Sequence, residues 1–145
     1  MKGEPHAGYG SDDEVEELVR GFESCELPPA EFNHREHLLV ALCYLRRMGD
    51  AEALTRLRAA IGRYAAAHSV NPSLYHETVT VFWLKRVRAF VEREGGGAGL
   101  AALANRVGAE CGTSGLVREY YSEGLLDSAE ARRVWREPDL KPLDF

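Results

Sequence analysis

Three histidines are the residues best suited to carry chemistry in this sequence. His34 and His37 lie three positions apart, and His76 stands much later, in the segment Tyr75-His76-Glu77-Thr78. Residues three apart on a helix are neighbours on one of its faces, so the first two imidazoles can bind one metal ion. Imidazole nitrogens are good ligands for copper, zinc and iron, and three of them with one open coordination position are typical of a catalytic metal site.

The apolar pattern around these histidines predicts that all three face the protein interior. His37 precedes Ala41 by four residues and His76 precedes Trp83 by seven, so each continues the apolar face of its own predicted helix. His34 lies on the same helix face as His37. If the two helices pack nearly parallel, the three imidazoles converge at one end of a helical bundle.

Three further side chains are candidates for acid-base chemistry near the histidines. Glu77 directly follows His76, about 100° further round a helix, so it is predicted to accept a hydrogen bond from a metal-bound histidine or to act as a general base. Glu31, three residues before His34, is the other carboxylate within reach. Tyr121, the second of two adjacent tyrosines, is a candidate catalytic phenol, with core packing as the alternative.

The elements that must position these residues are predicted to be helices. No segment alternates apolar and polar residues with the period of a strand, whereas several carry apolar residues at helical spacing, which indicates an all-α fold. We expect main helices over residues 12–24, 30–48, 50–68, 73–94 and 100–107, and short helices after residue 108, the last over residues 129–136. Residues 1–10 are predicted to be a disordered lead-in and residues 11–145 a single helical domain, a bundle of four to five main helices.

Two segments in the second half of the chain have distinct predicted roles. The glycine-rich stretch 95–99 cannot remain helical and is predicted to be a flexible joint. Such a joint would let the C-terminal third of the chain move over the end of the bundle as a lid. Residues 138–143 contain prolines at positions 138 and 142, so they are expected to form an extended tail laid against the body.

Length and composition narrow the class of protein. The chain has 145 residues, 45% of them hydrophobic, and a net charge of -5. A chain of this size can bury a core without a structural metal, so a bound metal would serve chemistry rather than folding. The acidic balance argues against binding to nucleic acid or to an anionic membrane. No apolar run approaches the length of a transmembrane helix, and the cytoplasm is the expected compartment.

The number and spacing of the cysteines narrow the class of protein further. Cys25, Cys43 and Cys111 are odd in number, lie far apart and form no Cys-x-x-Cys pair. A disulfide framework and a cysteine-rich zinc site are therefore not expected. The histidines remain the leading set of metal ligands, and the sequence leaves open whether Glu31 or Glu77 joins them.

Three groups of motifs occur in a fixed order along residues 24–143. They are Phe32-Asn33-His34-Arg35-Glu36-His37-Leu38, then Tyr75-His76-Glu77-Thr78 with Phe82-Trp83-Leu84, then Tyr120-Tyr121-Ser122 running on to Pro138-Asp139-Leu140-Lys141-Pro142-Leu143. Together they resemble a family of small bacterial proteins of uncharacterised function. The resemblance implies that the His-x-x-His and Tyr-His-Glu-Thr elements belong together. A looser similarity is to DinB-type helical bundles, which hold a metal through three histidines and include thiol-dependent transferases.

The leading hypothesis from the sequence is a metal-dependent enzyme that acts on a small molecule at a mononuclear site formed by His34, His37 and His76. Copper and zinc suit these three imidazoles equally, and iron ranks third. Copper or iron would support oxidative chemistry, whereas zinc would activate a water molecule or polarise a carbonyl for hydrolysis or group transfer. The alternative is a non-catalytic helical module that binds a small ligand or a partner, with the histidines as buried hydrogen-bonding groups. The sequence predicts neither the substrate nor the oligomeric state.

Overall fold

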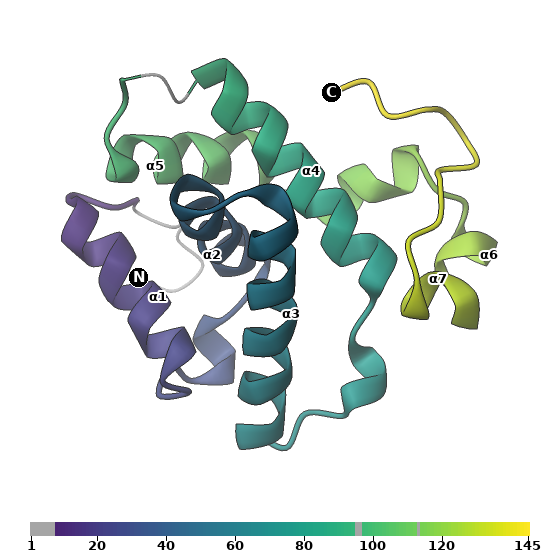
Figure 1. Cartoon of the computed structure of the whole chain (residues 1–145), viewed down its shortest axis with the longest axis horizontal. Helices are drawn as coiled ribbons and strands as arrows, with labels where there is room; N and C mark the ends of the chain where they lie inside the picture. Colours follow the sequence, from purple (N-terminus) through teal and green to yellow (C-terminus); the bar gives the residue numbers. More distant parts are fainter. Residues whose placement is uncertain (1–7, 95–96, 113) are drawn as a thin grey trace.

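Helices account for the regular structure of the chain. The computed structural model describes residues 8–94, 97–112 and 114–145, and no strand occurs within these ranges. Five main helices form the body, and two short helices follow near the C-terminus (Figure 1). The predicted all-α, single-domain fold is confirmed. No helix in the described ranges is long and apolar enough to cross a membrane.

The main helices are α1 (Asp12–Glu23), α2 (His34–Arg47), α3 (Asp50–Ala67), α4 (Glu77–Glu94) and α5 (Leu100–Cys111). The short C-terminal helices are α6 (Glu123–Leu126) and α7 (Ala129–Arg133). Three 3-10 helices lie in the connections: η1 (Pro29–Glu31), η2 (Pro72–Leu74) and η3 (Ser114–Glu119).

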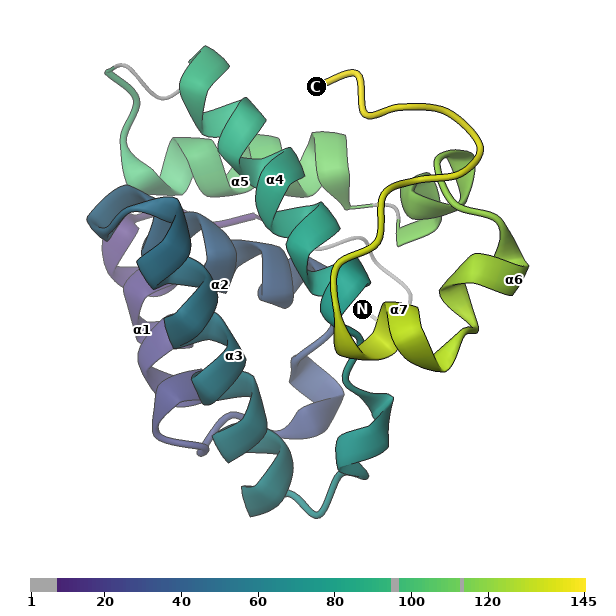
Figure 2. The ribbon, with the colours of Figure 1, turned by 45° about the vertical axis from the view of Figure 1, so that its right-hand side comes forward.

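Helix α2 is the central element of the fold. It packs against α1, α3, α4 and α5, which surround it (Figures 1 and 2). Residues 38–45 of α2 are all buried, so this part of the helix has no solvated face. A helix that is apolar all round has to be covered on every side, and this requirement draws the other four main helices together.

Two helices begin later than the sequence pattern predicts, and in both the reason is a cap. Helix α2 begins at His34 rather than at residue 30, because Asn33 caps it and the Asn33 N–H donates to Glu36 Oε1 at 2.9 Å in a capping box. Helix α4 begins at Glu77 rather than at residue 73. The Val79 N–H donates to His76 Nδ1 at 3.3 Å, so the imidazole of His76 caps α4 from just outside the helix.

The C-terminal segment folds back along α4 (Figure 2). Helix α7 packs against α4, and the Leu140 N–H donates to the Tyr120 carbonyl at 2.9 Å. Phe145 meets the ring of Phe82 edge to face, with centroids 5.5 Å apart. These contacts hold the tail against the body, as the sequence predicted.

The described end of the predicted lead-in is attached to α5. The Tyr9 N–H donates to Asn105 Oδ1 at 2.8 Å, and the Tyr9 carbonyl accepts from Asn105 Nδ2 at 3.0 Å. Tyr9 is half-buried and thus differs from the disordered segment predicted there. Residues 1–7 of the lead-in, and Gly95 and Gly96 of the predicted joint, lie outside the described residues.

Candidate functional site

A cavity of about 780 Å³ lies between α2, α3 and α4, and all three candidate histidines are on its wall. The segment that joins α3 to α4 completes the wall on one side. Most of the lining is apolar and includes Leu38, Ala41, Leu57, Ile61, Val79, Trp83 and Leu84. His34, His37 and His76 therefore lie on the wall of one cavity.

His37 is the most solvent-exposed of the three candidate histidines, so the predicted inward orientation is wrong for this residue. Its ring stacks on Phe32 with centroids 4.0 Å apart. Nδ1 lies 2.8 Å from the carbonyl oxygen of Asn33, one turn earlier in the chain. Because a carbonyl only accepts, Nδ1 carries the proton of the neutral ring and Nε2 keeps its lone pair.

The two histidines of α2 are held in the neutral form. Partial desolvation by the surrounding protein atoms lowers the pKa of His37 and of His34. The backbone hydrogen bond of each ring acts in the opposite direction but is the smaller effect. Neutral imidazoles present a lone pair, so they are acceptors rather than cations at neutral pH.

His34 and His76 use their outer nitrogens for bonds to distant backbone. His34 Nε2 donates to the Cys111 carbonyl at 2.9 Å, which connects α2 to the end of α5. His76 Nε2 donates to the Leu126 carbonyl at 2.7 Å, while its Nδ1 accepts from the Val79 N–H at 3.3 Å. Both ring nitrogens of His76 are therefore engaged within the chain, whereas His34 retains the lone pair of Nδ1.

These hydrogen bonds do not fit a three-histidine metal site. In the part of the chain that the structure describes, no group of three or more His, Cys, Asp or Glu side chains is placed to hold an ion. To become a ligand, His76 would have to give up its bond to Leu126 or its cap on α4. The three rings lie on one cavity wall, but their free lone pairs do not form a set of three metal ligands. Metal binding therefore stays a prediction.

Glu77 is buried and holds Arg58 and Tyr75 rather than a histidine. Arg58 donates from Nε to Oε1 at 3.1 Å and from Nη2 to Oε2 at 2.5 Å, and the Tyr75 hydroxyl donates to Oε1 at 2.7 Å. Burial acts to raise the pKa of this carboxyl, but the bonds from Arg58 and Tyr75 outweigh it, so the pKa of Glu77 is lowered. A carboxylate bonded in this way ties α3 to the start of α4, and its role as a general base stays a prediction.

The structure does not bring Tyr121 or Glu31 to the cavity. Tyr121 is buried, its hydroxyl donates to the Arg136 carbonyl at 2.6 Å, and its ring lies edge to face with Trp135 and Phe82. This is the core-packing alternative, and it fixes the C-terminal segment to α4. Glu31 is exposed in η1, and neither residue lines the cavity.

Arg58 and Tyr75 are the residues of the site that the sequence pattern missed. Arg58 directly follows Leu57 on α3 and lies off the apolar stripe, so its position predicts an exposed side chain. Its partner Glu77 lies 19 residues later in the sequence, and helical spacing predicts no contact between residues so far apart. Tyr75 is only two residues from Glu77, and this short separation was the one local hint of the network.

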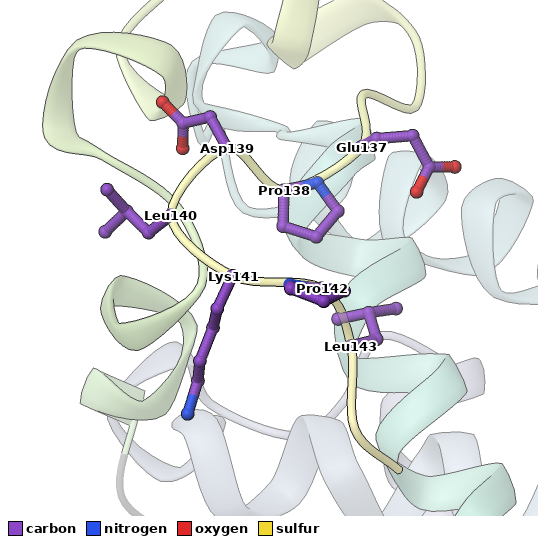
Figure 3. A pocket seen from close by; sticks show the side chains of 7 residues that line it. All are labelled: Glu137, Pro138, Asp139, Leu140, Lys141, Pro142 and Leu143. Atoms are coloured by element: carbon purple, nitrogen blue, oxygen red, sulfur yellow. The ribbon is translucent and has the colours of Figure 1, made fainter.

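A second hollow, of about 470 Å³, lies along the C-terminal tail and is lined by residues 137–143 (Figure 3). Figure 3 shows the side chains of Glu137, Asp139 and Lys141 pointing in different directions. Asp139 accepts from the Ser122 N–H at 2.8 Å and from the Ser122 hydroxyl at 2.6 Å. The charged groups of this hollow therefore do not converge on a common point.

No family model matches the chain, and neither does any curated protein or solved structure. The resemblances to a small bacterial family and to DinB-type bundles accordingly stay predictions. The function has to be argued from the cavity between α2, α3 and α4.

We expect Glu77→Gln to lower the free energy of unfolding by about 1–3 kcal/mol, because it removes the charge of a buried carboxylate that accepts from Arg58 and from the half-buried Tyr75. The matched control is Glu130→Gln, which removes an exposed ion pair with Arg136 (2.6 Å). Exposed pairs contribute about 0–1 kcal/mol. Urea unfolding of the two variants and the wild type measures the difference, and equal losses in both variants would contradict the role assigned to Glu77.

Proposed function

We propose that this protein binds a small, mainly apolar molecule in the cavity formed by α2, α3 and α4. The observation that carries the proposal is the volume of about 780 Å³ combined with a mostly apolar lining. Small-molecule sites are typically clefts of about 300–1,000 Å³ with apolar walls and a few polar groups. An apolar ligand that enters such a cavity is removed from water, and this transfer drives binding.

The rim of the cavity supports the same proposal. Leu74 in η2 is 65% exposed, whereas most large apolar side chains of the described chain are buried. It lies beside the cavity lining formed by Pro72 and Tyr75. A ligand in the cavity would cover this exposed leucine and bury additional apolar surface.

The proposal corresponds to the alternative that the sequence left open, a helical binding module with hydrogen-bonded histidines. It needs no metal for folding or binding, and the net charge of -5 fits a small-molecule ligand better than nucleic acid or an anionic membrane. His34 and His76 then position the wall of the cavity, because their bonds to Cys111 and Leu126 connect α2 and the start of α4 to distant segments.

The metal-dependent enzyme is a second proposal, and one observation favours it. His34 Nδ1 and His37 Nε2 each retain a lone pair, and the two residues are three apart on the wall of one cavity. Two imidazoles can begin a copper, zinc or iron site, whose remaining ligands would have to come from a rearranged His76 or from the bound molecule.

Filling the cavity is expected to block binding. In Ala65→Trp the indole would occupy space at the wall of α3, so the affinity for naphthalene, a neutral apolar probe, should fall about tenfold or more. The matched control is Ala59→Trp, an exposed position on the same helix that does not line the cavity. Titration followed by naphthalene fluorescence measures both. Equal affinities in the two variants, or no saturable binding to the wild type, would contradict the proposal.

Metal analysis separates the two proposals. Protein without a His tag is incubated with copper, zinc or iron, desalted and examined by mass spectrometry, together with His34→Ala and His76→Ala. A binding module predicts less than one equivalent of metal in all three proteins. One equivalent in the wild type that both substitutions remove would instead support a shared histidine site and the enzyme hypothesis.

A further inference from the structure

The polar side chains of the cavity wall are largely bonded to other parts of the chain. Arg58 and Tyr75 bond Glu77, and both nitrogens of His76 are engaged. Bonds to the neighbouring backbone involve Thr80 Oγ1 with the His76 carbonyl (2.9 Å), Asn33 Nδ2 with the Ala30 carbonyl (3.1 Å), and Asn71 Oδ1 with the Ser73 N–H (3.0 Å). Because these groups already have partners, they offer little to a ligand.

Two imidazole nitrogens of the wall, His34 Nδ1 and His37 Nε2, keep a lone pair, and His37 is the more exposed of the two residues. Its Nδ1–H is committed to the Asn33 carbonyl, and the stacking on Phe32 holds the plane of the ring. Nε2 lies at the opposite edge of the imidazole and has no hydrogen-bond partner among the described residues. Because His37 is exposed, water can reach this nitrogen while the cavity is empty. A ligand that displaces this water without supplying a donor leaves the acceptor unsatisfied, so the nitrogen discriminates between ligands with and without a donor.

The charge at the cavity wall is balanced within the chain. Arg58 is the one charged side chain among the described lining residues, and it is bonded through two nitrogens to Glu77, whose side chain is only 10% exposed. An anionic ligand would have to compete with this carboxylate for Arg58. A cationic ligand would find no unpaired carboxylate among the described lining residues. An anion would thus gain little from the already paired Arg58, and a cation would lose water without gaining a counter-charge.

We infer that the ligand is an uncharged, mainly apolar molecule with a hydroxyl or N–H group that donates a hydrogen bond to His37 Nε2. The inference rests on the proposed binding function and adds the polarity of the ligand and one of its contacts. Phenols and apolar alcohols meet the description. Carboxylates and phosphates do not, and a pure hydrocarbon would leave the lone pair of His37 without a donor.

Three naphthalenes of similar size test the ligand class by calorimetric titration of the wild-type protein at neutral pH. They are 2-naphthol, which has a donor, 2-methoxynaphthalene, which has none, and 2-naphthoate, which is an anion. One hydrogen bond predicts that 2-naphthol binds about five- to tenfold more tightly than the methyl ether, with naphthoate the weakest. Equal affinities for the first two, or tightest binding of naphthoate, would overturn the inference and leave the binding proposal intact. No binding of any of the three would overturn both.

Substitution of His37 tests the contact itself. His37→Phe keeps a planar ring on Phe32 but removes Nε2, so the preference for 2-naphthol over the ether should disappear while the affinity for the ether persists. The matched control is His68→Phe, since His68 bonds the Cys25 carbonyl at 2.9 Å and does not line the cavity. The readout is a ratio of two affinities for one protein, so a variant with reduced stability still reports on the contact. A preference retained in His37→Phe would overturn the inference.

Discussion

The buried carboxylate of Glu77 constrains the arrangement of the helices around the cavity. A carboxylate taken out of water is costly unless cations and donors replace its hydration, and here Arg58 and Tyr75 do so. These partners come from α3 and from the segment that joins α3 to α4. The three elements are therefore held at a fixed separation, and the cavity lies between them and α2. The same bonds pair Arg58, the one charged side chain of the described lining, with a carboxylate.

The histidines act within this framework as connectors. His34 connects α2 to the end of α5 through Cys111, and His76 connects the start of α4 to α6 through Leu126. Each bond satisfies a backbone carbonyl that would otherwise lack a donor at a helix end. These bonds give His34 and His76 a structural role at the starts of α2 and α4. His37 differs because its own bond is local, to Asn33, and leaves one nitrogen directed to neither backbone nor side chain.

The sequence predicted the number and order of the main helices because apolar residues at helical spacing mark the face that a helix buries. Helix α2 is the most extensively buried example, since residues 38–45 are all buried. It misplaced the starts of α2 and α4, where the caps formed by Asn33 and His76 stop the helix short and the preceding residues form η1 and η2. The placement of the histidines on one wall followed from the same spacing.

The hydrogen-bond partners of the site were beyond sequence reasoning. Cys111 lies 77 residues from His34 and Leu126 lies 50 residues from His76, so only the packed fold brings each pair together. The same holds for Arg58 with Glu77. For Tyr121 the sequence left two alternatives open, a core residue or a catalytic phenol. Its hydrogen bond to the Arg136 carbonyl depends on how the C-terminal segment folds back along α4. Local patterns thus identify which face a residue occupies, whereas tertiary contacts decide what its polar atoms do.

The protonation of the three imidazoles is the most direct test of a neutral, acceptor-bearing cavity wall. Nitrogen–proton correlation NMR of the histidine rings at neutral pH reports which ring nitrogen carries the proton. The structure predicts a proton on Nδ1 of His37 and on Nε2 of both His34 and His76. A proton on Nε2 of His37, in either the neutral or the doubly protonated ring, would remove the acceptor and contradict this account of the cavity.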